Sequence, residues 1–173
     1  DHFALGRLIT EVQKLDDGHM EAIVLAAAGL KRLGLASRIT QWLEPPTWLP
    51  APAQGIVAVQ IRREDDTIRA MIRQLHDEEA WRAATAERAF LHALEGGCQV
   101  PVRALASRRE DGLWLDGVVL DVEGGAAVRG ALRLDDGADA SAEVGGGALA
   151  ATLLGKGGDV LLSRARSAAA MRQ

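Results

Sequence analysis

The chain has 173 residues, enough for one domain or two small ones, and its 48% hydrophobic content is ordinary for a protein with a packed core. A formal net charge of -4 and only 3% aromatic residues, with no tyrosine, exclude bulk attraction to nucleic acid and a base-stacking surface. The longest apolar stretch, residues 22–30, is too short to span a membrane. One cysteine and an N-terminus unlike a signal peptide predict a reducing, cytoplasmic location.

The first part of the chain has the pattern of an incomplete α/β unit. Apolar residues at helical spacing predict a helix over residues 5–15, which ends in the turn Asp16-Asp17-Gly18. The continuous apolar run at residues 22–26 is typical of a buried strand, and a helix is expected to begin within residues 30–35. A helix, a turn and a buried strand together resemble part of an α/β unit.

Prolines interrupt regular structure over residues 45–52. The β-branched run at residues 56–61 then predicts a strand, and apolar residues at helical spacing follow it over residues 68–75. A domain boundary is expected near His76, which divides the chain into residues 1–75 and 76–173.

The second part is predicted to be a small α+β domain with a three-stranded antiparallel sheet and helices on one face. Asp77 is the expected N-cap of a helix that Gly96 ends. Alternating or apolar runs predict strands near residues 100–106, 113–120 and 128–134, and Pro101 indicates that the first begins late or lies on an edge. A closing helix is expected over residues 139–154, weakened by three consecutive glycines.

The only cysteine, Cys98, follows Gly96-Gly97, where the backbone can approach other groups closely. A lone thiol is either a small buried hydrophobe or a nucleophile or attachment point. It lies just past the expected end of a helix, and that end of the helix dipole does not favour a thiolate, so nearby cations would have to do so. The four histidines are scattered without the spacing of metal ligands, so no metal site is expected.

Three stretches resemble the porphobilinogen deaminase, or hydroxymethylbilane synthase, family. The first runs over residues 14–35, the second is Leu49-Pro50-Ala51-Pro52-Ala53-Gln54-Gly55, and the third runs over residues 85–101 and contains Glu95-Gly96-Gly97-Cys98-Gln99. They occur in the family's order, and the resemblance is weak beyond about residue 102. It implies a partial α/β domain like that of periplasmic binding proteins, comprising part of the second domain and a return segment to the first. A small C-terminal α+β domain would follow.

The resemblance also implies a chemistry. Enzymes of the family polymerise four porphobilinogen units into a linear tetrapyrrole with release of ammonia, on a dipyrromethane primer attached as a thioether to the cysteine of this motif, here Cys98. A soft thiolate suits capture of an electrophilic methylene carbon. Arg32 matches a family arginine that faces the site, and arginine suits the carboxylates of the growing chain. Arg32 could otherwise be a solvated surface charge.

The chain departs from the family in four positions and in extent. Leu5 and Glu11 stand where the family has arginines, Arg7 stands where it has asparagine, and Ala53 stands where it usually has glycine. A glutamate would oppose a polyanionic product. The family's N-terminal portion, with its catalytic aspartate, has no counterpart here, so no catalytic residue is assigned.

Three interpretations of such a chain therefore remain open. It is the C-terminal portion of an enzyme, one chain of a two-chain enzyme, or a non-catalytic paralogue or fragment that binds a tetrapyrrole or a partner protein. Residues 1–75 are expected to be swapped with a neighbour, paired with a second chain, or unusually packed, because half a domain leaves strand edges and apolar faces uncovered.

Overall fold

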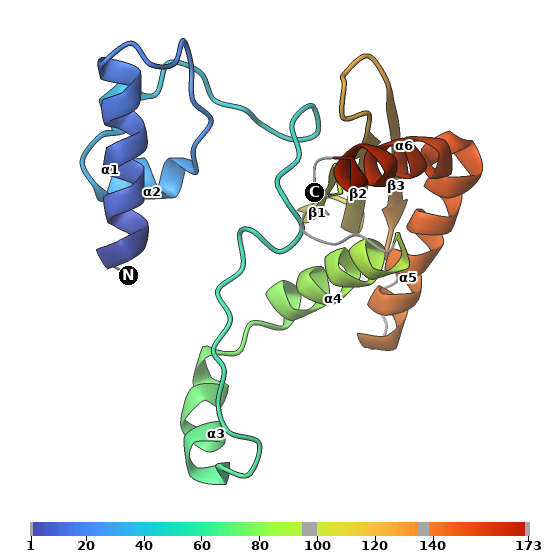
Figure 1. Ribbon diagram of the computed structural model, residues 1–173. Coiled ribbons are helices and arrows are strands. Elements are labelled where there is room, and N and C mark those ends of the chain that lie inside the picture. Colours follow the sequence, from blue (N-terminus) through green and yellow to red (C-terminus); the bar gives the residue numbers. More distant parts are fainter. Residues whose placement is uncertain (1, 95–99, 135–138, 172–173) are drawn as a thin grey trace. The chain divides into compact units, whose positions relative to one another are not determined.

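The computed structural model describes residues 2–94, 100–134 and 139–171 (Figure 1). The chain forms two compact units, Asp1–Leu43 and Glu44–Gln173. This division differs from the boundary expected near His76. Residues 44–55 belong to the second unit because their backbone makes hydrogen bonds with its sheet and with a helix, as described below.

The first unit is helical in the residues described. Helix α1 spans His2–Asp16, helix α2 spans Ala27–Arg32, and a short 3-10 turn covers Ala36–Arg38. Val12 and Leu30 are buried between them. A Cβ added at Gly29 would meet a Leu8 methyl group, so a glycine is needed where the two helices approach. The helix predicted over residues 5–15 is confirmed.

Two predicted strands are wrong. Residues 22–26 and residues 56–61 have no regular secondary structure, and the only sheet of the described residues lies later in the chain. A run of apolar or β-branched residues suits a strand, but the strand exists only where a second backbone pairs with it. The described residues before α4 (Glu78–Ala93) therefore contain helices, turns and loops, and no β-ladder.

The second unit is built on a three-stranded antiparallel sheet, as the sequence predicts. Strands β1 (Val102–Arg109), β2 (Gly112–Leu120) and β3 (Ala127–Arg133) are hydrogen-bonded in the order β1-β2-β3. The strand that follows Pro101 begins late and lies on an edge, as expected. With its helices, the unit is α+β.

Helices α4 and α5 (Asp139–Leu153) cover one face of this sheet. A Cβ at Gly117 of β2 would lie 2.7 Å from Phe90 of α4 and 3.1 Å from Leu149 of α5. Glycine therefore lets both helices approach the middle strand closely. The buried side chains of this face and its helices form the core cluster: Ala86, Phe90, Leu94, Val102, Ala104, Leu113, Leu115, Val119, Leu134, Ala142, Leu149, Ala150, Leu153, Leu161 and Leu162.

The glycines in α5 have a packing role that their sequence pattern does not reveal. A Cβ at Gly146 would collide with the backbone of α4 at the carbonyl oxygen of Ala86, and one at Gly145 would collide with the Leu134 side chain. Gly147 has nothing within 4 Å of the same position. Two of the three glycines thus permit close packing, which offsets the low helix propensity of glycine.

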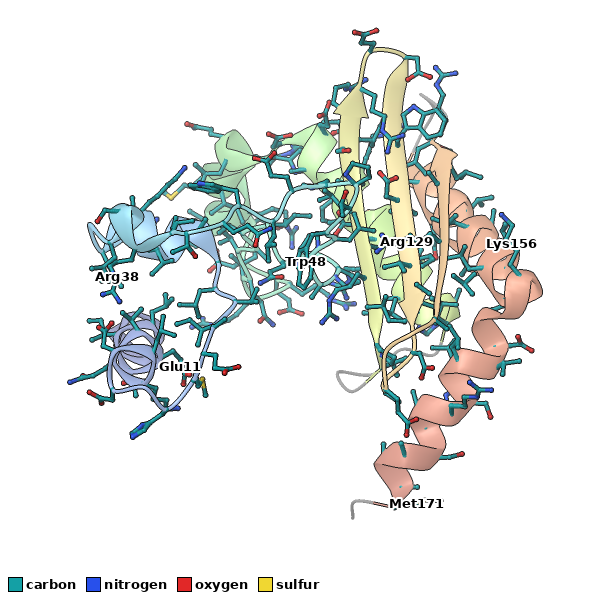
Figure 2. The ribbon with its side chains drawn as sticks, turned by 90° about the horizontal axis from the view of Figure 1, so that it is seen from above. Glu11, Arg38, Trp48, Arg129, Lys156 and Met171 are labelled. Carbon is teal, nitrogen blue, oxygen red and sulfur yellow. The ribbon has the colours of Figure 1, made fainter. Side chains whose placement is uncertain are left out.

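The opposite face of the sheet is partly covered by the proline-rich segment. Arg129 of β3 shares that face with its register partner Val118 and donates hydrogen bonds to the carbonyl oxygens of Pro46 and Thr47. Arg129 and Trp48 lie on this side of the sheet, away from Lys156 (Figure 2). Leu49, in the same segment, is buried. Residues 44–55 therefore lie across this face of the sheet instead of merely linking two parts of the chain, and we call them the strap.

Two further helices complete the second unit. Helix α3 spans Asp66–Ile72, in the region of the helix predicted over residues 68–75. Helix α6 spans Asp159–Ala170 and was not predicted. It follows α5 after a π-type turn, Leu154–Gly158, in which Gly157 has a φ of 98°. That backbone angle suits glycine and separates the two helices.

Candidate functional site

The cysteine expected to carry the chemistry, Cys98, lies outside the described residues. Its flanks are described, and both are buried: Leu94, at the end of α4, is 1% exposed, and Val102, which begins β1, is 2% exposed. The segment between them therefore starts and finishes at fixed points of the core. The positions of these two points depend on how α4 is held.

Helix α4 is determined by signals at its start and along one face. The Asp77 carboxylate accepts a hydrogen bond from the Ala80 amide at 3.0 Å, as its predicted N-cap role requires. Ala83, Ala86 and Phe90 form the buried stripe against the sheet and α5. This packing fixes the direction of the helix axis and hence the position of Leu94.

Glu87 is a buried carboxylate in the middle of α4. It is 3% exposed, and its two oxygens accept hydrogen bonds from backbone amides on two other elements. Oε1 accepts from Ala106 of β1 at 2.7 Å, and Oε2 accepts from Ala53 of the proline-rich segment at 2.5 Å. Burial raises the pKa of Glu87 above its ordinary value, and the two hydrogen bonds partly oppose that shift. One side chain thus joins α4, the edge strand and the strap.

The proline-rich segment pairs with the same edge of the sheet through its backbone. The Ala104 amide of β1 donates a hydrogen bond to the Pro50 carbonyl oxygen at 3.2 Å. Two residues further along β1, the Ala106 amide donates to the Glu87 carboxylate. The outward-facing amides of Ala104 and Ala106 on this edge strand are therefore satisfied. Sequence reasoning missed Glu87, although it lies within the stretch that carries the resemblance, because its role depends on contacts with residues far along the chain.

Ala53 adopts a φ of 60°, a left-handed conformation in which a Cβ is strained. The family resemblance leads us to expect glycine at this position. The substitution noted in the sequence therefore meets a backbone that favours glycine, and the hydrogen bond to Glu87 is among the contacts that hold the alanine there.

The second predicted site residue, Arg32, is the last residue of α2, in the first unit, and it is exposed. The other cations of the described part of this unit are engaged. Lys14 pairs with Glu11, Lys31 lies 4.8 Å from the ring centroid of Trp42, and Arg38 pairs with Asp16. Among the described residues, no carboxylate pairs with Arg32. Its guanidinium can therefore donate hydrogen bonds to the carboxylate of a ligand.

The acidic residue at a family arginine position has a local partner. The Lys14 Nζ and Glu11 Oε1 atoms lie 2.8 Å apart on successive turns of α1, and both side chains are partly exposed. The Glu11 charge is therefore partly neutralised within the helix, which lessens the repulsion expected toward an anionic ligand. Leu5 lies in the same helix, but its side chain is outside the described part.

A wide open groove of about 1260 Å³ lies in the second unit, between the outer side of α4 and residues 53–76. Its walls carry cations and rings, with Arg73 and Arg88 beside His76 and Trp81, whose rings lie 5.9 Å apart. Neither predicted site residue lines the described part of this groove. Arg32 belongs to the first unit and Cys98 is not described, so the two are not brought together by any described contact.

Two expected absences can be compared with the described residues. In the part of the chain that the structure describes, no three histidine, cysteine or acidic side chains gather in a way that could hold a metal ion. Over the same residues, no helix combines the length and apolarity needed to cross a membrane.

Comparison with known proteins identifies relatives for both parts of the chain. Residues 4–70 match the family profile of the porphobilinogen deaminase dipyrromethane cofactor binding domain, and residues 81–155 match that of the porphobilinogen deaminase C-terminal domain. Among curated proteins, a porphobilinogen deaminase of Roseiflexus sp. (strain RS-1) is 46% identical over 91% of this chain and 51% of its own length.

Other relatives give the same picture. A porphobilinogen deaminase of Syntrophotalea carbinolica is 43% identical over 91% of this chain and 49% of its own length. A porphobilinogen deaminase of Stenotrophomonas maltophilia (strain K279a) is 48% identical over 72% of this chain and 41% of its own length. The chain therefore spans about half the length of the curated relatives it matches.

Proposed function

Because the chain belongs to the porphobilinogen deaminase family, we propose that it is the cofactor-carrying portion of a hydroxymethylbilane synthase. The whole enzyme would polymerise four porphobilinogen units into a linear tetrapyrrole and release ammonia. The observation that carries this proposal is the agreement of both family profiles with the chain, in order, over residues 4–70 and 81–155.

In this proposal Cys98 holds a dipyrromethane through a thioether. When bound, the dipyrromethane supplies the acceptor pyrrole to which substrate units are joined. The chain's own contribution is a single thiol between two buried anchor points, Leu94 and Val102. A reducing cytoplasm would keep that thiol free of disulfides.

Arg32 is proposed to bind a carboxylate of the cofactor or of the growing chain. Three features of the first unit support this role: its guanidinium is exposed, it has no carboxylate partner among the described residues, and the neighbouring cations are engaged elsewhere. A planar guanidinium can form two parallel hydrogen bonds with one carboxylate, which orients it as well as binding it.

We propose that a further polypeptide part completes the site. The segment around residues 56–61 leaves Val57 90% exposed and Val59 56% exposed, although its composition suits a sheet. A second chain or a swapped neighbour packed against this segment would cover these side chains and complete the domain to which residues 1–75 are expected to belong. The aspartate that performs acid–base chemistry in the family would come from that part.

The test is the intact mass of the purified 173-residue chain, produced with and without the N-terminal half of the Roseiflexus relative and supplied with porphobilinogen. The proposal predicts a mass increase of two linked pyrrole units in the combined sample, mapped to the peptide that contains Cys98. Cys98→Ser should abolish the increase, and Arg32→Met should reduce it, whereas Arg62→Met, a cation outside the proposed site, should not. An unmodified wild-type chain in the combined sample would contradict the proposal and favour a non-catalytic fragment.

A further inference from the structure

Helix α6 lies beyond the part of the chain that matches the family profile, which ends at residue 155. It is nevertheless built into the core. Leu161 and Leu162 belong to the same buried cluster as Phe90 and Leu94 of α4, and Ala165 is buried as well. The side of α6 that carries these residues therefore packs into the core of the second unit.

A polar contact between described residues joins the two helices at the point where α4 ends. The Arg166 guanidinium nitrogen Nη2 donates a hydrogen bond to the Leu94 carbonyl oxygen at 3.2 Å. The last carbonyl groups of an α-helix have no partner within the helix, and the C-terminal end carries partial negative charge. A guanidinium there satisfies a buried acceptor and opposes that partial charge.

The location of this contact gives it a bearing on the reaction. Leu94 is 1% exposed and precedes the cofactor cysteine by four residues in the sequence. On the other side of the cysteine, Val102 is held by β1 and by its amide hydrogen bond to the Val100 carbonyl at 2.8 Å. The second anchor is thus part of the sheet, whereas the first depends on how the end of α4 is held.

We propose that Arg166 is a positioning residue that holds the C-terminal end of α4 at Leu94, the last described residue before the segment that carries Cys98. The role of Cys98 as the cofactor-carrying residue rests on the proposed function, whereas the contact between Arg166 and Leu94 does not. Arg166 acts through Leu94 rather than on the cofactor. Helix α6 then supports the end of α4, in addition to covering the core.

The experiment compares Arg166→Met, Arg166→Lys and Arg164→Met in the 173-residue chain. Arg164 is the matched control because it lies on the same helix, its side chain is 64% exposed, and its ion pair with Asp121 is long, at 4.0 Å between Nη1 and Oδ2. Two quantities are measured: amide hydrogen exchange in the peptide spanning residues 91–102, and the alkylation rate of Cys98 by iodoacetamide.

We expect Arg166→Met to accelerate exchange at the end of α4 about tenfold, the size of effect expected when a hydrogen bond from a charged donor is lost. The alkylation rate of Cys98 in Arg166→Met should also differ from the wild-type rate. Arg166→Lys, which keeps a charged donor, should recover most of the wild-type behaviour, and Arg164→Met should match the wild type. If Arg166→Met does not fold, the comparison of Arg166→Lys and Arg166→Gln, charged and neutral donors, replaces it.

Two results would overturn the inference: exchange and alkylation in Arg166→Met equal to those in Arg164→Met, or equal acceleration of exchange in β2, which would indicate general loosening of the core. The amount of cofactor acquired with the completing N-terminal half is the third measurement. If the wild type acquires none, the proposed function fails, while the exchange comparison still decides the role of Arg166. If the wild type and Arg166→Met acquire equal amounts, the positioning role fails alone.

Discussion

Replacing Glu87 by alanine should weaken the second unit more than any surface substitution on the same helix. The substitution removes the acceptor for two backbone amides, those of Ala53 and Ala106. A fully buried donor left without a partner costs about 1–3 kcal/mol. Both alanines are only half-buried, so water can partly replace the carboxylate, and removal of a buried charge offsets part of the loss. We expect a net loss of about 2 kcal/mol in the free energy of unfolding.

Urea denaturation followed by tryptophan fluorescence measures this loss. For a denaturant slope of about 2 kcal/mol per molar, the unfolding midpoint should fall by about 1 M. Glu79→Gln is the matched control, because Glu79 lies on the same helix and forms an exposed ion pair with Arg108 at 2.5 Å. Such a pair contributes about 0–1 kcal/mol, so the control midpoint should move little. Equal midpoints for Glu87→Ala and the wild type would refute the view that this carboxylate joins the helix, the edge strand and the strap.

The remaining predictions concern pH and glycine. Since burial raises the folded-state pKa of Glu87 above its ordinary value of 4.5, the stability advantage of the wild type over Glu87→Gln should be fully present below pH 4.5 and should fall as pH rises through the folded pKa; an advantage that grows with pH, in urea titrations at several pH values, would contradict this. Ala53→Gly should raise the thermal unfolding midpoint by relieving left-handed strain, a gain of about 0.5–1 kcal/mol after the entropy cost of glycine. Gly146→Ala should lower the free energy of unfolding by about 1–3 kcal/mol through its clash with α4, whereas Gly147→Ala should raise it by about 0.5–1 kcal/mol; an increase for both in calorimetry would show that propensity alone governs α5.

Elements whose determinants are local could be predicted from the sequence. Asp77 caps α4 because an acidic side chain at that position can reach an amide three residues ahead, and no distant residue is needed. The three strands of the second unit follow each other closely, and their pairing is between neighbours in the chain. Period and turn signals were therefore enough to predict the antiparallel sheet, including the edge position of the strand after Pro101.

The two incorrect strand predictions have a common cause. Residues 22–26 and 56–61 have strand-like composition, but composition describes only one side of a β-ladder. The partner must come from elsewhere, and the described residues supply none. Helix α6 was not predicted because the glycines around Gly157 suggest the end of a helical region. In the structure they separate two helices, α5 and α6.

Local patterns in the amino-acid sequence thus determined the helices with clear caps, the order of the sheet, and, through its motifs, the family and the cysteine expected to hold the cofactor. Tertiary structure alone decided that Glu87 joins three elements, that Ala53 is held in a left-handed conformation, and that Arg166 closes the end of α4. The difference is physical. Capping and periodicity depend on neighbours a few residues apart, whereas the partner of a buried carboxylate, amide or carbonyl is chosen only when distant segments meet.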